Sequence, residues 1–254
     1  MTMVDGAVRV FIVGAGPGDP ELRTLKAARL VATADVVLYD RLVSTEILAL
    51  ASPHAELIDV GKRPGGSHTQ DVLNELLVAI AEPGRRVVRL KGGDPFLFGR
   101  GGEEVEVLAR HGIASEVVPG ISSALAGPAA AGIPVTHRQV ARAVTIVTGH
   151  EALSSDPVNW AAVADLGGTL VLLMAIERRH EIVERLCAAG FDEHTPAAVV
   201  MDATTPRQRV WCGTLRALAA ADVASPAVIV IGAVAAFADH AEALVAAHSQ
   251  PSGG

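Results

Sequence analysis

Residues 89–96 read RLKGGDPF, and the interpretation of the chain starts from this stretch. It continues an apolar run, VVRLK at 87–91, whose β-branched start predicts a buried strand. Two glycines then permit backbone angles closed to other residues, and Asp94-Pro95 fixes the exit of the turn. The stretch predicts a loop of bare backbone at the carboxyl end of a strand, where open α/β sheets bind ligands. Taken alone, GGDP is also compatible with a plain turn.

Strand-like runs alternate with helical patterns through the first half of the chain. The runs are VRVFIV, DVVLY, ELIDV, RVVRLK and SEVVP, and the helical patterns cover residues 21–34, 45–51, 69–81 and 102–111. Such alternation predicts a mostly parallel five-stranded sheet with helices on both faces. We therefore expect an N-terminal α/β domain over residues 1–119.

The second half has a different pattern. Residues 122–138 are rich in Gly, Ala and Pro and look like a crossover. Strands are expected at AVTIVTG, GTLVLLM, PAAVVM, RQRVWCG and PAVIVIG, with a loop up to Trp160, helices over 177–189 and 214–221, and a last helix. Only DATTP separates PAAVVM from RQRVWCG, which predicts a hairpin and hence a mixed sheet. We expect a C-terminal α/β domain over 120–247 and a flexible tail over 248–254.

Composition restricts the classes of partner. Half of the 254 residues are apolar, the formal net charge is −7, and aromatic residues make up 3% of the chain, so a general nucleic-acid surface is not expected. Cys187 and Cys212 lack metal-ligand spacing and are expected to be reduced core thiols, in keeping with a cytoplasmic protein. No export signal is visible, and the longest apolar stretch, 227–238, is too short to span a bilayer, so no membrane partner is expected. His68 and His150 also lack ligand spacing, and no metal site is expected.

A second glycine-rich turn, GAGPGD at 14–19, follows the first strand and precedes a helix. A dinucleotide-binding loop is the rival interpretation, but it would need glycine where Asp19 stands, and Pro17 removes a donor inside the loop. Asp19 would cap the following helix well and would repel a pyrophosphate. The sequence therefore disfavours a dinucleotide.

Charged residues gather at the same predicted edge of the sheet. Asp40 ends the second strand, and Lys62 and Arg63 follow the third. A carboxylate and an ammonium facing one cleft could transfer protons, whereas a surface ion pair of Asp40 with Arg41 is the plainer alternative. Six further basic residues, each by itself expected to be a solvated surface charge, together suggest a local site for anions such as carboxylates: Arg89, Lys91, Arg100, His137, Arg138 and Arg142.

Read in order, the motifs GAGPGDPELRTLKA, VLYDRLV, GKR, HTQ, RLKGGDPFLFGRGGEE, VPGISSA, GIPVTHR and TGH resemble the uroporphyrinogen-III C-methyltransferase family of tetrapyrrole methyltransferases. The similarity runs from about Arg9 to Phe237. It implies a two-domain homodimer that binds S-adenosyl-L-methionine in the cleft between its domains and releases S-adenosyl-L-homocysteine. RLKGGDPFLFGRGGEE is specific to the uroporphyrinogen branch.

The resemblance also implies roles for individual residues. Asp40 would be the proton acceptor and Lys62 the proton donor, and Arg89 and Met174 would lie near the tetrapyrrole. The residues that match the family's cofactor contacts are Pro17, Gly92, Gly93, Asp94, Leu97, Ser122, Ser123, Met174 and Ala203. Many relatives have glycine in place of Ala203.

The activity implied is methylation of uroporphyrinogen III at C-2 and then C-7 to give precorrin-2, for sirohaem and/or cobalamin biosynthesis. A related methyltransferase acting on a later precorrin or on a protein side chain is one alternative. A non-catalytic regulator that keeps the cofactor pocket is another.

Overall fold

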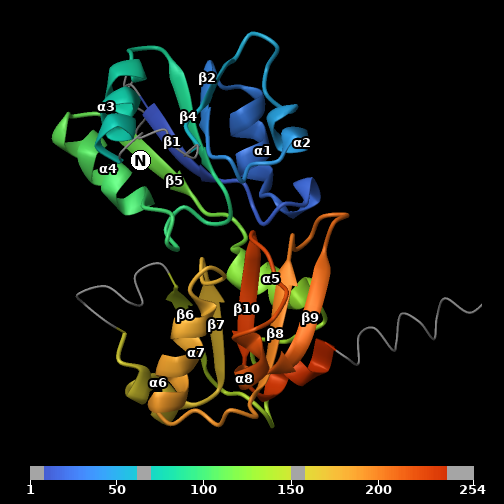
Figure 1. Ribbon diagram of the computed structural model, residues 1–254. Coiled ribbons are helices and arrows are strands. Elements are labelled where there is room, and N and C mark those ends of the chain that lie inside the picture. The colour runs from blue at the N-terminus through green and yellow to red at the C-terminus, as the bar shows by residue number, and fades with distance from the viewer. Residues whose placement is uncertain (1–8, 62–69, 150–157, 239–254) are drawn as a thin grey trace, which may run out of the picture. The chain divides into compact units, whose positions relative to one another are not determined.

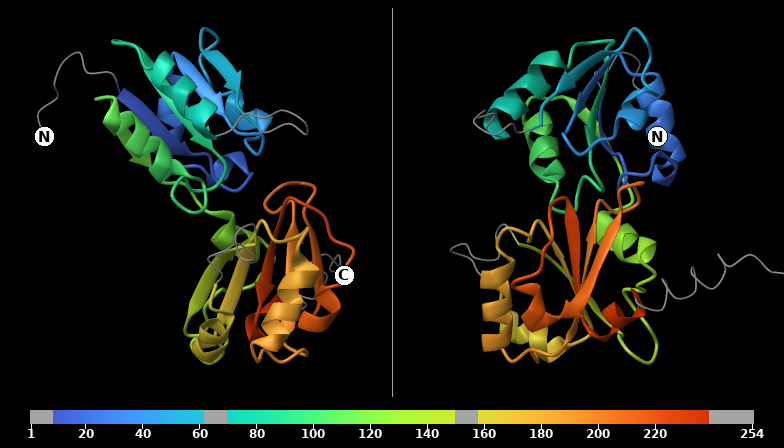
Figure 2. Two further views of the ribbon diagram at one scale, coloured as in Figure 1. Left: turned by 60° about the vertical axis from the view of Figure 1, so that its left-hand side comes forward. Right: turned by 45° about the vertical axis from the view of Figure 1, so that its right-hand side comes forward.

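The computed structural model describes residues 9–61, 70–149 and 158–238. The chain divides into two compact units, Met1–Ser122 and Ser123–Gly254. Each unit has its own sheet (Figures 1 and 2). The predicted tail at 248–254 lies outside the described residues, as do Lys62, Arg63, His68 and His150.

The first unit contains a five-stranded sheet in which every pairing is parallel, which confirms the predicted architecture. Its strands are β1 (Arg9–Gly14), β2 (Val36–Tyr39), β3 (Glu56–Asp59), β4 (Arg86–Lys91) and β5 (Ala114–Val118). They lie in the order β3-β2-β4-β1-β5. Since β4 and β5 both flank β1, the loops that follow these three strands emerge side by side at the carboxyl edge.

Helices cover both faces of this sheet (Figure 1). On one face α1 (Leu25–Ala32) and α2 (Thr45–Leu48) bury a cluster that includes Val13, Val37 and Leu90. On the other face α3 (Gln70–Ile80) and α4 (Gly101–Arg110) bury Ile12, Leu38 and Val87. Alternate residues of each strand thus feed opposite cores, as in a sheet buried on both sides.

The helix predicted over 21–34 is two elements. A 3₁₀ turn, η1 (Pro20–Leu22), comes first, and α1 begins anew after Thr24, whose hydroxyl accepts a hydrogen bond from the Ala27 amide. Thr24 has extended backbone angles and is the N-cap of α1, so the helix cannot continue through it.

The second unit contains the predicted mixed sheet, in the order β6-β7-β10-β8-β9. The strands are β6 (Val144–Thr148), β7 (Thr169–Leu173), β8 (Pro196–Met201), β9 (Arg209–Thr214) and β10 (Ala227–Ile231). β6 and β7 are parallel, and the other pairings are antiparallel. The predicted hairpin is β8–β9.

One face of the second sheet packs against α6 (Trp160–Leu166), α7 (Arg179–Ala188) and α8 (Leu215–Leu218). On the other face lies α5 (Ser123–Ala130), where the missing Cβ of Gly127 would approach the Val228 side chain to 3.1 Å. The segment predicted as a crossover therefore contains a core helix. The last described element is a 3₁₀ turn, η2 (Ala233–Ala236).

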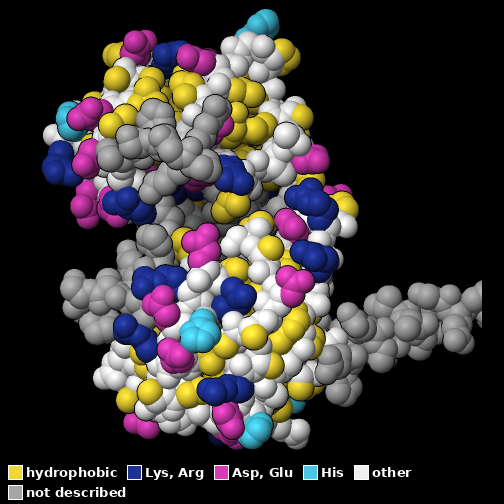
Figure 3. Space-filling model, viewed as in Figure 1, with side chains coloured by type: hydrophobic (Ala, Val, Ile, Leu, Met, Phe, Trp, Pro, Cys, Tyr) yellow, Lys and Arg dark blue, Asp and Glu magenta, His cyan; other side chains and the backbone are white. Residues whose placement is uncertain are grey.

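The prediction that both cysteines lie in the core is wrong for Cys212. Cys187 is half-buried on α7 and packs against the core of the second unit, whereas Cys212 is exposed on the edge strand β9. Across the three described ranges, no helix is both long enough and apolar enough to cross a membrane. On the face seen in Figure 3, acidic and basic side chains are interspersed.

Candidate functional site

Three loops meet at the carboxyl edge of the first sheet. They follow β1, β4 and β5 and are named here the first glycine loop (residues 14–19), the GGDP loop (92–95) and the PGIS loop (119–122). The first two are joined through their backbones. Gly93 N donates to Gly16 O at 2.7 Å, Gly16 N donates to Gly93 O at 3.2 Å, and Ala15 N donates to Lys91 O at 2.7 Å. The two predicted ligand loops therefore form one surface.

The PGIS loop lies so close to the other two that side chains are excluded. A Cβ on Gly120 would lie 2.1 Å from Gly93 O and 2.8 Å from the Gly14 Cα, and a Cβ on Gly14 would lie 2.5 Å from Gly120 N. These neighbours are backbone atoms, which cannot rotate away. Glycine is required at both positions by close approach of the backbones.

Asp94 joins the GGDP loop to the PGIS loop through both carboxylate oxygens. Oδ1 accepts from the Phe96 amide at 2.8 Å, and Oδ2 accepts from the Gly120 amide at 3.0 Å. The first of these bonds closes the turn that Pro95 begins. Asp94, a predicted cofactor-binding residue, thus also sets the shape of the loop.

The helix cap predicted at Asp19 is instead a cap of the 3₁₀ turn η1, because α1 begins after Thr24. Asp19 is the N-cap of η1, and its side chain accepts a hydrogen bond from the Glu21 amide at 2.7 Å. The Asp19 carboxylate is thus bound at the end of the loop, and the N-terminus of the helix α1, where a pyrophosphate would bind, lies beyond it at Thr24. Pro17 is half-buried in the same loop.

Asp40 follows β2 at this carboxyl edge, and its ionic partner is Arg89 on β4. Arg89 Nη2 donates to Asp40 Oδ1 at 2.5 Å, and the Asp40 amide donates to Leu90 O at 3.3 Å. The surface pair with Arg41 considered from the sequence is therefore not the one formed. The Asp40 side chain is 32% exposed and that of Arg89 only 3%, so the accessible member of the pair is the carboxylate.

Arg89 uses its three guanidinium nitrogens within the protein. Besides Asp40, it donates from Nε to Glu104 Oε1 at 3.1 Å and from Nη1 to Leu90 O at 3.2 Å. Lys91 Nζ donates to the same Glu104 oxygen at 2.8 Å. Arg89, Lys91 and Glu104 are all buried, so the prediction that the first two are solvated surface charges is wrong: each is neutralised inside the domain by a carboxylate from α4.

The environment of Lys91 disfavours its charge. Burial is the main cause that lowers the pKa of Lys91 below its ordinary value of 10.5, and the nearby Arg89 guanidinium lowers it further. The Glu104 and Asp40 carboxylates raise the pKa of Lys91 and oppose these effects in part. Arg100 differs, because it lies at the surface and bonds Glu103.

Glu104 is the residue at this edge that the sequence did not single out. Its side chain is fully buried in the first turn of α4, between Gly101 and Leu108 on the buried face of that helix. The spacing 101, 104 and 108 marks a single helix face and could have shown that this acid points inward. Among the described residues, Glu104 Oε2 has no hydrogen-bond partner.

Two more predicted cofactor residues lie in the first unit. Leu97 is half-buried just after the GGDP loop, and Ser122 is buried in the PGIS loop. Gly92 is half-buried, and a Cβ there would meet only the Leu42 side chain, at 3.1 Å. The predicted residues Pro17, Gly92, Gly93, Asp94 and Ser122 are thus brought together on joined loops.

The predicted residues of the second unit also share one edge of a sheet. Met174 follows β7, and Ala203 follows β8; both strands run antiparallel to β10, which lies between them. Met174 is exposed and has a positive φ of 53°, a conformation that non-glycine residues adopt at a cost. Ala203 is buried between Asp202 and Thr204, which also have positive φ. Ser123 is the first residue of α5 and is half-buried.

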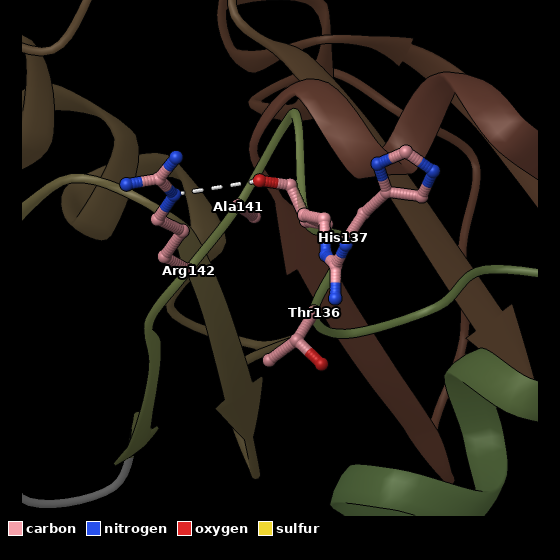
Figure 4. Close-up of a pocket in the computed structure, with 5 residues that line it drawn as sticks. Thr136, His137, Ala141 and Arg142 are labelled. Carbon is pink, nitrogen blue, oxygen red and sulfur yellow. Dashed lines mark hydrogen bonds between the residues drawn. The ribbon is translucent and has the colours of Figure 1, made fainter.

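Three members of the predicted basic cluster lie on one turn of the second unit. His137, Arg138 and Arg142 line an open surface pocket of about 520 Å³ together with Thr136 and Ala141 (Figure 4). His137 N donates to Ala141 O at 2.8 Å, and the His137 ring lies 5.3 Å from that of Phe237. Arg142 Nε donates to Arg138 O at 3.4 Å. Both arginines are exposed and could meet an anion from solvent.

The sequence of this chain is similar to those of known methyltransferases and siroheme synthases. The tetrapyrrole (corrin/porphyrin) methylases match residues 9–219. The siroheme synthase of Chromobacterium violaceum is 51% identical over 92% of this chain and 51% of the relative. The uroporphyrinogen-III C-methyltransferase of Synechocystis sp. is 49% identical over 89% of each. The chain spans about half the length of the siroheme synthases that it matches.

A solved structure is similar throughout. The uroporphyrin-III C-methyltransferase of Thermus thermophilus, complexed with S-adenosyl homocysteine, aligns with a TM-score of 0.77 and 45% identity over 89% of this chain and 98% of that one. Most of the chain is thus matched by one family in sequence and in fold. The chain belongs to the tetrapyrrole (corrin/porphyrin) methylase family.

Proposed function

We propose that this chain transfers methyl groups from S-adenosyl-L-methionine to C-2 and C-7 of uroporphyrinogen III and so forms precorrin-2. The observation that carries the proposal is the half-exposed Asp40 carboxylate, held by Arg89 at the same sheet edge as three joined glycine loops. Relatives bearing the name of this activity support the choice of substrate.

The loops of the first unit suit the cofactor. Their half-buried glycines leave peptide groups within reach of a small molecule, as a ligand with an adenine and a ribose requires. Asp94 would supply a negative charge that favours a cationic sulfonium if the cofactor binds at this loop. We assign cofactor binding to Pro17, Gly92, Gly93, Asp94, Leu97 and Ser122 in this unit, and to Ser123, Met174 and Ala203 in the second.

When bound, S-adenosyl-L-methionine supplies an activated methyl group, so the protein chiefly has to position the acceptor carbon. We assign to Asp40 the uptake of the proton that the methylated ring must lose. Arg89 is buried, and its three guanidinium nitrogens all donate hydrogen bonds within the protein, so we assign it to orienting Asp40. Met174 is exposed, and we assign it to contact with the tetrapyrrole. His137, Arg138 and Arg142 suit the substrate's carboxylates, since guanidinium groups pair with carboxylates in bidentate fashion.

The test is anaerobic incubation of the purified protein with S-adenosyl-L-methionine and freshly generated uroporphyrinogen III, followed by mass spectrometry of the tetrapyrrole. The expected result is a gain of two methyl groups. Asp40→Asn is expected to lower turnover by about 100-fold or more while leaving S-adenosyl-L-homocysteine affinity unchanged. An unmodified tetrapyrrole, with S-adenosyl-L-homocysteine still bound, would reject this substrate in favour of a later precorrin or a protein acceptor.

We also propose a cytoplasmic homodimer, as the family resemblance implies. Sedimentation of the purified chain tests whether it forms a homodimer. A single species with twice the 26.2 kDa chain mass is expected, and a monomer across the micromolar range would contradict it.

A further inference from the structure

Glu104 occupies an unusual position for an acidic residue. Its side chain is fully buried in α4, and one of its oxygens accepts hydrogen bonds from both Arg89 Nε and Lys91 Nζ. Glu104 is not among the residues assigned to bind the substrate or the cofactor. Glu104 is instead connected to the Asp40 carboxylate, because the Arg89 guanidinium donates hydrogen bonds to both acids.

The contacts form a continuous chain. Glu104 Oε1 holds Arg89 Nε, Leu90 O holds Arg89 Nη1, and Arg89 Nη2 holds Asp40 Oδ1. A guanidinium is rigid and planar, so fixing Nε and Nη1 also fixes the direction of Nη2. The accessible end of this chain is Asp40, and its buried end is Glu104.

The charges of the four side chains cancel. Two carboxylates, Asp40 and Glu104, face two cations, Arg89 and Lys91. Glu104 also lies in the first turn of α4, where the helix dipole favours an anion. Without the Glu104 charge, Arg89 and Lys91 would repel one another inside the domain. Arg89 would also lose the hydrogen bond from its Nε to the Glu104 carboxylate.

We propose that Glu104 is a positioning residue for the methyl transfer: it fixes the Arg89 guanidinium, which in turn fixes the Asp40 carboxylate toward the acceptor ring. The inference rests on the proposed function, because it assigns the reacting end of the chain to Asp40. If Glu104 had a purely structural role, replacing it would lower the free energy of unfolding, and its effect on turnover would be the same whether or not Asp40 is present.

The first experiment compares Glu104→Gln with Glu106→Gln, an exposed acid on the same helix that undergoes the same chemical change. Glu104→Gln is expected to lower kcat about 10- to 100-fold, as loss of groups that orient a functional side chain does, with the S-adenosyl-L-homocysteine affinity unchanged. Glu106→Gln is expected to keep the wild-type kcat. A Glu104→Gln kcat within about twofold of wild type would overturn the inference.

A double-mutant cycle separates positioning from structure. If Glu104 acts through Asp40, adding Glu104→Gln to Asp40→Asn costs little further turnover, whereas independent effects multiply. Full multiplication of the two losses would overturn the inference.

Because Glu104→Gln leaves two buried cations with one partner fewer, it could fail to fold. The variant Lys91→Met/Glu104→Gln removes one charge of each sign and restores the balance. Compared with Lys91→Met alone, the double variant is expected to show the same 10- to 100-fold loss of kcat. Equal activity of these two variants would contradict the role of Glu104.

A readout without turnover separates this inference from the proposed function. The Arg89 Nε–H resonance in ¹⁵N NMR, assigned by its loss in Arg89→Lys, is expected to shift in Lys91→Met/Glu104→Gln relative to Lys91→Met, and not in Glu106→Gln. If the wild type methylates uroporphyrinogen III but the resonance and kcat are insensitive to Glu104, only the inference fails. If the wild type does not methylate it, the proposed function fails, and an unshifted resonance would still overturn the inference.

Discussion

At the residue scale, Asp94 shows how one side chain sets the geometry of two loops. Its two oxygens accept hydrogen bonds from the amides of Phe96 and Gly120. Hydrogen bonds to a charged acceptor are stronger than neutral ones, and both donors lose their partner together when the carboxylate is removed. The contribution of Asp94 to folding can therefore be separated from any contact with a ligand.

Asp94→Ala is expected to lower the free energy of unfolding by about 2–4 kcal/mol because two backbone donors lose a charged acceptor. Urea unfolding monitored by circular dichroism measures the change. Glu75→Ala, which removes an exposed acid from α3, is the control and is expected to stay within about 0.5 kcal/mol of wild type. An equal effect of the two substitutions would show that the loop holds without Asp94.

Lys91 gives the stability of the protein an alkaline pH dependence. Since its pKa is lowered in the folded state, mainly by burial and then by Arg89, the unfolded chain binds more protons between that lowered pKa and 10.5. The stability contribution of Lys91 is therefore at its minimum below this window and rises with pH through it.

The free energy of unfolding of the wild type, measured relative to Lys91→Met, is expected to increase as the pH rises toward 10.5. Urea titrations at several alkaline pH values test this. Lys26→Met controls for the loss of one positive charge at a more exposed position. A wild-type advantage that falls with rising pH would contradict the assigned direction.

The sequence indicated which residues lie at the carboxyl edge of the first sheet, but not which side chains pair with them. Asp40 and the GGDP loop could be placed because strand ends and glycines have local signals. The partner of Asp40 was not predictable in the same way, since Arg41 is adjacent in sequence while Arg89 is brought alongside by the pairing of β2 with β4. Glu104 is harder to place from the sequence, because two consecutive glutamates at a helix start usually face solvent.

At the scale of elements, close backbone contacts join the loops that follow the neighbouring strands β1, β4 and β5. The strand alternation predicted both sheets and the β8–β9 hairpin, because patterns of period two and turn residues are local. It did not predict that β4 lies between β1 and β2, which depends on packing of distant segments. Nor did it show α5, whose Gly- and Pro-containing sequence lacks a helical signal and is stabilised by packing on β10.

Gly120→Ala is expected to destabilise the protein by roughly 3 kcal/mol or more and to abolish S-adenosyl-L-homocysteine binding, because the new Cβ would overlap the carbonyl of Gly93. Calorimetry and urea unfolding measure the two effects.

Gly102→Ala is the matched control, because Gly102 lies in α4 with nothing within 4 Å of its Cβ position. There the added methyl is expected to stabilise by about 0.5–1 kcal/mol through helix propensity, with ligand affinity retained. Similar behaviour of both variants would mean that the loops can separate at little cost.

At the scale of the whole molecule, ligand binding couples to stability. A ligand that binds only the folded chain raises the free energy of unfolding by an amount set by its concentration relative to Kd. The two candidate ligand classes, a sulfonium nucleoside and a dinucleotide, can therefore be compared in one thermal experiment on the intact chain.

S-adenosyl-L-homocysteine at 100 times its Kd is expected to stabilise the protein by about 2.7 kcal/mol, seen as a higher Tm, whereas NAD at the same concentration is expected to leave Tm unchanged. Pro17 and Asp19 are the physical reason for the second expectation. A rise in Tm with NAD alone would reinstate the dinucleotide interpretation of the first glycine loop.

The mutual hydrogen bonds of the glycine loops have a consequence for how a ligand would be bound. The amides of Ala15, Gly93 and Gly120 already have partners in the described structure, so this edge is preorganised and little conformational entropy remains to be lost on binding. These amide protons should exchange slowly with deuterium in the ligand-free protein, and a cofactor should change that protection only slightly. A rigid receptor of this kind gains its affinity by avoiding the ordering of loops that flexible binding sites undergo.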